Sequence, residues 1–264
     1  MQTCLICGAS VRAVFALTVL AKHHVQYFHC GDCGFVCTEK PYWLEEAYSE
    51  SISVTDTGVL ERNWSLSAKL ACFLYGCMDA RGTYLDVAGG YGILTRMMRD
   101  YGFNYYWEDK FSPNLVARGF EAARAREPFV ALSGFEVMEH TPDPAEFVRE
   151  IMTRHDCRTF IFSTVTYPGL GPPSPDWSYL SPMTGQHISF FQQRTLTRLA
   201  QRLGLGFLSS GGVHVFTDRN LRNVSLFPVL VSKLAFALAQ AIRLRLGSRA
   251  GDDNQKLAEE MGRK

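Results

Sequence analysis

The chain has 264 residues, 47% of them hydrophobic and 12% aromatic, and a formal net charge of only +1. These values exclude a disordered or collagen-like chain and allow one substantial α/β domain with a small appendage. The charge is uneven: residues 1–193 hold 15 basic and 21 acidic side chains, whereas residues 194–264 hold 12 and 5. A basic C-terminal part can meet phosphates, an acidic partner or a membrane surface, or can form solvated helix faces.

Four cysteines near the N-terminus form two Cys-x-x-Cys-Gly pairs: Cys4 and Cys7 in "CLICG", and Cys30 and Cys33 in "CGDCG". Two such knuckles can surround one tetrahedral ion with four thiolates, and the glycine after each pair permits a tight turn. The alternative is two separate redox or free-thiol pairs. We therefore expect residues 1–40 to form a zinc-knuckle module whose ion stabilises a segment too small to build its own core.

No targeting segment is expected, because the apolar run over 11–21 lacks a basic region before it. The apolar run over 226–241 is interrupted by Pro228 and Lys233 and is short for a membrane span. We expect it to pack on the protein or on a second copy in a homodimer, with weak peripheral membrane contact as the alternative. These features predict a cytoplasmic protein with reduced cysteines.

Residues 41–80 carry aromatic and apolar side chains at helical spacing, which predicts a helical connector or cap with a helix over 60–78. Next, "TYLDVAGGYG" reads as a strand over 84–88 that runs into three glycines. The stretch "ILTRMMRDYG" then predicts a helix that ends at Gly102.

A short aromatic strand, "NYYWEDK", follows and ends in acids. Ser112 as N-cap and Pro113 at the first helical position then predict a helix over 113–126. Strand, glycine turn, helix, strand and acid is the order of a nucleotide-binding α/β domain. Asp109 lies 20 positions after Gly89, a spacing at which a carboxylate can hold both ribose hydroxyls.

The pattern D-x-A-G-G-x-G from Asp86 to Gly92 resembles the first motif of class I S-adenosylmethionine-dependent methyltransferases. The resemblance extends from about residue 26 to residue 207, and the chain is similar to bacterial members of this family that carry an N-terminal zinc knuckle. A nicotinamide-binding Rossmann domain is the alternative. The resemblance implies a Rossmann-like mixed sheet in a three-layer α/β/α core over 81–217, followed by a basic helical tail over 218–264.

The same resemblance implies the donor contacts. Five of the eight lie in the first strand or in its glycine turn, and the full set in chain order is Asp86, Ala88, Gly89, Gly90, Gly92, Asp109, Phe135 and Glu136. Asp109 would hold the ribose, with Glu108 as the alternative. Only 26 residues separate Asp109 from Glu136, so we expect the sheet to lack the usual third strand at its edge.

The stretch "GFEVMEH" places Glu136, Glu139 and His140 on one helical face after a strand over 130–135. With the later His187, these residues resemble the ligands of ubiquinone-pathway O-methyltransferases and small-RNA 2′-O-methyltransferases. That resemblance implies Mg²⁺ or a similar ion beside the acceptor oxygen. The alternatives are that His187 acts without metal as a general base, or is structural, and that the acidic segment only begins a helix.

The segment over 167–186 contains five prolines and reads as an ordered lid. Trp177 and Tyr179 within it are candidates for acceptor contacts, with plugs that bury the lid as the alternative, and Tyr179 joins His187 as a candidate catalytic residue. A helix over 193–205 and a hairpin over 205–217, turning at glycines 211 and 212, complete the expected sheet.

The sequence therefore predicts an S-adenosylmethionine-dependent methyltransferase with structural zinc, acting on the oxygen or carbon of a small molecule such as a sugar or biosynthetic intermediate. An RNA methyltransferase that grips its acceptor with the zinc module and basic tail is one alternative, and a non-catalytic scaffold is another. Nucleic acid is not expected, because the knuckles carry almost no Lys or Arg.

Overall fold

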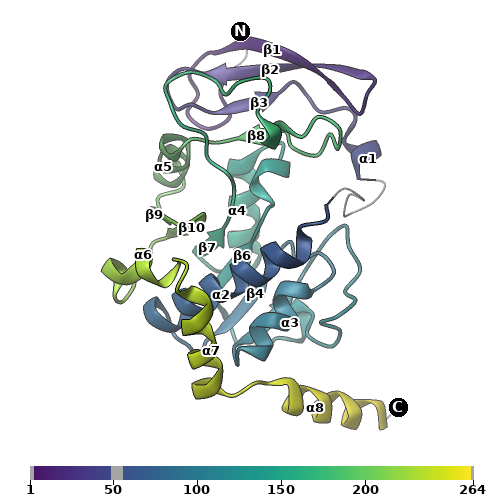
Figure 1. The fold of residues 1–264 in the computed structure, drawn as a ribbon, viewed down its shortest axis with the longest axis vertical. Helices are drawn as coiled ribbons and strands as arrows, with labels where there is room; N and C mark the ends of the chain where they lie inside the picture. The colour runs from purple at the N-terminus through teal and green to yellow at the C-terminus, as the bar shows by residue number, and fades with distance from the viewer. Residues whose placement is uncertain (1–2, 49–55, 263–264) are drawn as a thin grey trace.

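The computed structural model describes residues 3–48 and 56–262. In this part of the chain, strands form two sheets, a six-stranded sheet at the centre and a four-stranded sheet at the N-terminal end, at the top of Figure 1. The helices of the core pack around the central sheet, and the last helix, α8 (Ala250–Gly262), projects from the body.

The central sheet has the spatial order β5-β4-β6-β7-β10-β9. Its members are β4 (Thr83–Asp86), β5 (Asn104–Trp107), β6 (Phe129–Gly134), β7 (Thr159–Phe162), β9 (Gly206–Ser210) and β10 (Val213–Thr217). The first four in this spatial order are parallel, and β10 pairs antiparallel with both β7 and β9. The expected mixed sheet is confirmed, and so is the terminal hairpin.

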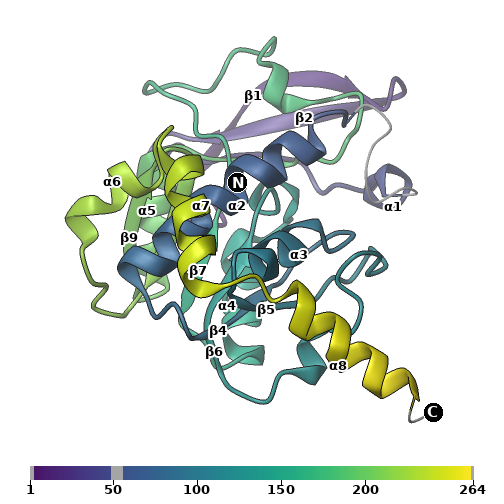
Figure 2. The ribbon, with the colours of Figure 1, turned by 60° about the horizontal axis from the view of Figure 1, so that its bottom comes forward.

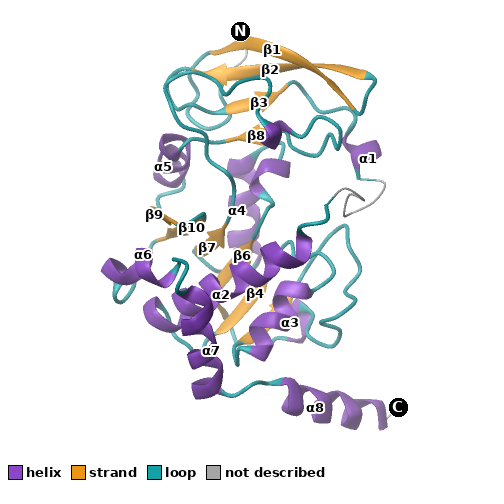
Figure 3. Cartoon of the chain, in the orientation of Figure 1, coloured by secondary structure: helices purple, strands orange, loops and turns teal. Residues whose placement is uncertain are grey.

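Helices cover both faces of this sheet (Figure 3). One face packs against α2 (Val59–Cys77), α3 (Ile93–Asp100) and α7 (Ala235–Leu246), and the other against α4 (Pro144–Arg154) and α5 (Gln193–Arg202). Side chains alternate along the strands: Tyr84 is buried in the cluster on the side of α2, and its neighbour Leu85 in the cluster on the side of α4. This period of two buries both faces and confirms the three-layer architecture.

The prediction of a helix over 113–126 is wrong. Only a short 3₁₀ turn, η1 (Ala122–Arg124), is present there. The chain instead returns to the sheet edge, where the Trp107 amide donates to the Phe120 carbonyl (2.8 Å) and Glu121 forms a parallel bridge with Trp107. Gly119, at a φ of 91°, interrupts a helix at this point. Within the described residues no full third strand follows β5, as expected.

The N-terminal sheet is antiparallel, in the order β1-β2-β3-β8. Its strands are β1 (Val11–Val19), β2 (His23–Cys30), β3 (Val36–Thr38) and β8 (Ser189–Phe190). The fourth strand comes from the range that the sequence assigns to the core. The first forty residues therefore do not close this sheet alone.

The connector contains α1 (Leu44–Ala47) and α2, while residues 49–55 of the expected helical range lie outside the described residues. α2 confirms the helix expected over 60–78. It lies against the sheet and beneath α7 (Figure 2).

The C-terminal region contains η4 (Val224–Leu226), α6 (Phe227–Leu230), α7 and α8. Phe227 and Ala239 are buried in the cluster around α2, so one side of the apolar run over 226–241 packs on the protein, as expected, while Leu234 and Phe236 stay exposed. Helix α8 is attached by a buried ion pair in which Arg99 contacts Asp253 at 2.5 Å.

Candidate functional site

The turn after β4 has the conformation that its glycines permit. Gly90 and Gly92 have φ of 51° and 88°, in the left-handed region that favours glycine. A Cβ on Gly89 would lie 2.5 Å from Cδ1 of Trp107, whereas a Cβ on Gly90 would meet no atom within 4 Å. The half-buried Ala88 leads into this turn. The turn therefore presents bare backbone at the carboxyl edge of the sheet, where ligands bind in open α/β folds.

Asp109 lies opposite this turn, just beyond the end of β5. Its Oδ2 accepts a hydrogen bond from the Gly90 amide (2.9 Å), and its Oδ1 accepts from the amides of Phe111 and Ser112 (both 2.7 Å). Each carboxylate oxygen has two lone pairs, so Asp109 can also accept from a ligand hydroxyl.

Glu108, the alternative acid, has a different environment. Its carboxylate accepts from Arg154 at 2.7 Å, and the contact with His155 holds its pKa below the usual range. Both partners lie at the end of α4, away from the turn. Asp109 is therefore the carboxylate that faces the glycines.

Asp86 is almost fully buried at the end of β4. Its Oδ1 accepts from the Ser133 hydroxyl (2.9 Å), which in turn accepts from the Tyr105 hydroxyl (2.7 Å). Its Oδ2 would be 3.1 Å from a Cβ on Gly89, so this oxygen faces the turn. Burial raises the pKa of Asp86 to about 7.

Phe135 and Glu136 follow β6 at the same sheet edge. Phe135 packs against the cluster around α2. Glu136 has a φ of 52°, its amide donates to the Ser163 hydroxyl (3.0 Å), and that hydroxyl donates to its Oε1. Burial and the nearby charge of Glu139 raise the pKa of Glu136. A non-glycine residue held in this strained backbone conformation is a common feature of functional sites.

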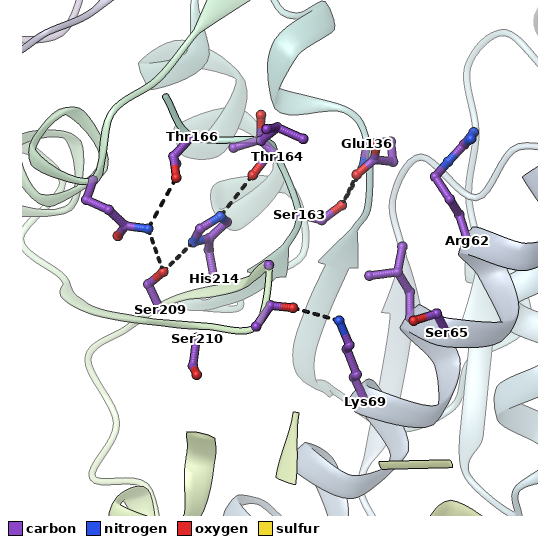
Figure 4. Close-up of a pocket in the computed structure, with 15 residues that line it drawn as sticks. Arg62, Ser65, Lys69, Glu136, Ser163, Thr164, Thr166, Ser209, Ser210 and His214 are labelled. Carbon is purple, nitrogen blue, oxygen red and sulfur yellow. Dashed lines mark hydrogen bonds between the residues drawn. The ribbon is translucent and has the colours of Figure 1, made fainter. Parts of the chain in front are cut away.

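Glu136 also lines a cavity of about 560 Å³ (Figure 4). The cavity lies between α2, the end of β7 and the turn between β9 and β10. Arg62 and Lys69 contribute cations from α2, and His214 contributes a buried imidazole. Six hydroxyl side chains line the cavity: Ser65, Ser163, Thr164, Thr166, Ser209 and Ser210. The volume suits a small organic molecule.

Three of the four expected ligands of the second ion come together. One ligand atom each of Glu139, His140 and His187 lies within 4.8 Å of the other two. Glu139 and His140 lie on the short turn η2 (Met138–His140). The fourth residue, Glu136, is outside this group, because its carboxylate is held by Ser163.

The two imidazoles are anchored through their Nδ1 atoms. His187 Nδ1 lies 2.6 Å from the Tyr179 carbonyl oxygen, and His140 Nδ1 lies 2.8 Å from the Tyr48 hydroxyl and 3.2 Å from the Gln186 carbonyl oxygen. A carbonyl only accepts, so the Nδ1 of His187 carries a proton, and in the neutral ring its Nε2 offers a lone pair. Burial lowers the pKa of His140 to about 3, which keeps this ring neutral.

Glu139 is fully buried beside these rings. Its Oε1 accepts from the Tyr179 hydroxyl at 2.6 Å, but its Oε2 has no hydrogen-bond partner among the described residues. A buried carboxylate oxygen without a partner is costly. Two free imidazole nitrogens and this orphaned oxygen fit a divalent ion, and the anchored Nδ1 atoms are typical of metal-binding histidines.

The lid places its two aromatic candidates differently. The Tyr179 hydroxyl contacts Glu139, and its ring lies 4.6 Å from that of His187. Trp177 packs between Tyr167 and Phe190, at centroid distances of 5.8 and 6.0 Å. Tyr179 therefore belongs to the polar cluster, and Trp177 to the apolar core beneath the lid.

The cysteine knuckles form a compact sulfur cluster. Cys4 and Cys33 have Sγ atoms 3.6 Å apart, those of Cys7 and Cys30 are 3.5 Å apart, and all four lie within 4.8 Å of one another. A disulfide would need about 2.05 Å. Four thiolates at about 2.3 Å from a tetrahedral ion are about 3.8 Å apart, so this set fits zinc.

The sequence analysis did not identify several residues of the site. Ser163 directly follows a buried strand, so its place at the sheet edge is a signal that sequence reasoning can use. Tyr48, Ser133 and Arg62 reach the site only through tertiary packing, and no motif marks them.

Comparisons with known proteins agree with this architecture. Residues 65–210, more than half of the chain, match the family described as a methyltransferase domain. No curated protein matches the sequence.

Similar solved structures include magnesium protoporphyrin IX methyltransferase from Synechocystis PCC 6803, with 11% identity, a TM-score of 0.41, and coverage of 66% of this chain and 90% of that one. The mitomycin 7-O-methyltransferase has 13% identity, a TM-score of 0.43, and coverage of 66% and 59%. An O-methyltransferase family 2 protein from Planctomyces limnophilus has 13% identity and a TM-score of 0.44, with coverage of 67% of this chain and 61% of that one. The chain thus spans about three fifths of the length of the last two. By its sequence and its mixed six-stranded sheet, the chain belongs to the methyltransferase domain family and has the class I methyltransferase fold.

Proposed function

We propose that the protein transfers a methyl group from S-adenosylmethionine to a small-molecule acceptor. The observation that carries this proposal is the bare glycine turn opposite Asp109 at the carboxyl edge of β4 and β5. Asp86 and the turn would hold the methionine part, and Asp109 the ribose. Phe135 and Glu136 would lie beneath the sulfonium.

The acceptor would enter the cavity beside Glu136. Hydroxyl side chains and two cations around about 560 Å³ suit a polar small molecule such as a sugar or a biosynthetic intermediate. In the reaction, the bond from sulfur to the methyl carbon breaks as the bond from that carbon to the acceptor forms. Holding the two reactants in line accounts for most of the rate gain.

We assign proton removal to His187. In the neutral ring Nδ1 donates to the Tyr179 carbonyl and Nε2 keeps its lone pair, with which it would accept the proton of an acceptor hydroxyl or acidic carbon. The cluster of Glu139, His140 and His187 also fits Mg²⁺ or a similar ion, which would lower the pKa of the acceptor group when bound. A manganese titration, followed by the paramagnetic resonance signal of free Mn²⁺, separates the two roles. A fall of this signal with the wild type but not with Glu139→Gln supports the ion, and no fall with either protein leaves His187 as a base alone.

We infer a structural zinc ion in the four-cysteine cluster. Its knuckles dock on the start of α5, where the Thr195 hydroxyl donates to the Cys33 carbonyl at 2.7 Å. A Cβ on Gly34 would lie 2.0 Å from Oε1 of Gln192, so this docking depends on the glycine. The ion would therefore tie the N-terminal sheet to the core.

Calorimetry with S-adenosylhomocysteine tests the proposed donor site. Binding should be measurable with the wild type and weakened by Gly90→Val, whose side chain enters the open space above the turn. Equal heats for both proteins would place the nucleoside elsewhere. No heat with either protein, at ligand concentrations at which other methyltransferases bind S-adenosylhomocysteine, would contradict the function itself.

A further inference from the structure

The C-terminal segment from η4 through α7 exposes apolar side chains on its outer side. Seven of its side chains are more than one third exposed: Val224, Leu226, Val229, Leu234, Phe236, Leu238 and Leu244. The most exposed is Leu244, at 88%. Exposed apolar patches of this kind mark interaction sites.

The inner side of α7 is already used. Ala235, Ala239 and Ile242 are buried in the cluster that contains α2, which fixes the opposite side of the helix outward (Figure 2). On α2, the half-exposed Trp64 meets the Phe236 ring edge-on at 5.0 Å. The apolar surface therefore continues from α7 onto α2, and its tryptophan is of the kind enriched where proteins meet lipid headgroups.

The chain segment that carries most of this surface is basic, and the exposed acid Glu61 lies one turn before Trp64 on α2. Residues 219–251 contain six basic side chains and no acidic one. At 100° per residue, Arg243 and Arg245 flank Leu244 on either side of the outward face, and both are exposed, as is Lys233 before the helix. Long basic side chains can lie along apolar surface and hold their charges at the level of the headgroups.

No single helix among the described residues is long and apolar enough to cross a membrane. Val224–Leu230 and Ala235–Leu246 pass that test only as a pair, with a bend of 108° between them. Because the inner side of α7 packs on α2, the pair lies along the protein surface. We propose that this apolar and basic face, from α6 through α7 to Trp64, docks on the surface of an anionic lipid bilayer.

Docking would bring the cavity close to the lipid. The turn between β9 and β10 touches the segment after α6, since a Cβ on Gly211 would lie 2.6 Å from the Val231 carbonyl oxygen. Lys69, which lines the cavity, donates to the Gly211 carbonyl at 2.7 Å. The proposed face and the cavity thus share one border.

Sedimentation of the full chain with vesicles tests the proposal. The wild type should bind vesicles of phosphatidylcholine mixed with phosphatidylglycerol and bind pure phosphatidylcholine at least tenfold more weakly. The double change Arg243→Gln and Arg245→Gln should reduce binding to the anionic vesicles by about 25-fold, at about fivefold per charge. Leu244→Glu should reduce it at least tenfold, because the glutamate removes apolar contact and adds repulsion.

The matched control is Leu170→Glu, which makes the same change at a leucine of similar exposure (83%) in the lid. This variant should bind like the wild type. The proposal is overturned if neither vesicle type binds, or if the two leucine variants behave alike. It is also overturned if light scattering shows that Leu244→Glu splits a dimer while vesicle binding is unchanged, since the face would then belong to a second copy of the chain.

Discussion

The two clusters of candidate metal ligands are built in opposite ways. The four cysteines come from two local turns, in which Gly8 and Gly34 amides donate to the carbonyls of Cys4 and Cys30. His187 is 47 positions from His140, and only the packing of the lid brings them together. The cysteine set is complete, whereas Glu139 keeps an oxygen without a partner among the described residues. This comparison supports the proposal that the first is a closed structural site and the second an open functional one.

The largest effect should come from breaking the closed site. Cys30→Ser should lower the zinc content from about one per chain towards none and lower Tm by about 10 °C or more. Structural zinc contributes several kcal/mol to folding, and about 1 kcal/mol shifts Tm by roughly 2–4 °C at this size. Elemental analysis and thermal unfolding provide the measurements.

Cys157→Ser is the control for that experiment, because it alters a buried thiol outside the cluster. It should retain the metal. If Cys30→Ser also retains it, or if the folded wild type holds none, the thiolates are not a zinc site.

The open site should respond in the opposite way. His187→Ala should lower turnover by about 100-fold, the usual contribution of a general base, while Tm and donor affinity stay near those of the wild type. Turnover is measured as S-adenosylhomocysteine formed with the first acceptor that the wild type methylates. His24→Ala, at an exposed histidine, is the control; a large drop in Tm for His187→Ala would make that residue structural.

Donor binding should be separable from both clusters. Asp109→Ala should weaken S-adenosylhomocysteine binding by about 30-fold, corresponding to about 2 kcal/mol for charged hydrogen bonds, with zinc content unchanged. Calorimetry provides the measurement, and Asp176→Ala in the lid is the matched control.

A donor product without the ribose 2′ hydroxyl sharpens that assignment. The wild type should bind this compound less tightly than the complete compound. Asp109→Ala should bind this compound no less tightly than the complete one. If the hydroxyl matters equally in both proteins, Asp109 only supports the turn.

The smallest effect concerns Asp86. Its folded pKa, about 7, lies above the unfolded value near 3.8, so the folded state binds the proton more tightly. Stability is therefore lost as pH rises from about 4 to about 7. Asp86→Asn should be more stable than the wild type by roughly 1–2 kcal/mol at pH 8, and the two should be similarly stable at pH 4. Thermal unfolding at the two pH values provides the measurement. A difference that does not depend on pH would contradict the raised pKa.

Local sequence patterns predicted most of the core. The apolar strands, the glycine turn and the terminal hairpin followed from local patterns, and the 26-residue gap after Asp109 predicted the missing edge strand. The mixed order of the sheet followed from the resemblance to class I methyltransferases. The helix expected over 113–126 was wrong, because good helix formers there are outweighed by Gly119 and by edge hydrogen bonds to Trp107.

Long-range pairing lay beyond these patterns. The two-residue strand β8 is too short for any periodicity, yet it completes the N-terminal sheet by pairing with β3. Tyr48 at His140 and Ser163 at Glu136 are likewise contacts between segments that no local motif joins.

The sequence by itself determined the strands, the glycine turn and the cysteine knuckles, because each depends on the periodicity or backbone freedom of neighbouring residues. Only the tertiary structure decided that Glu139, His140 and His187 meet while Glu136 turns to Ser163 and the cavity. It also decided which side of α7 is buried and which is left outward. Such choices depend on how distant surfaces fit together, and a one-dimensional pattern does not encode that fit.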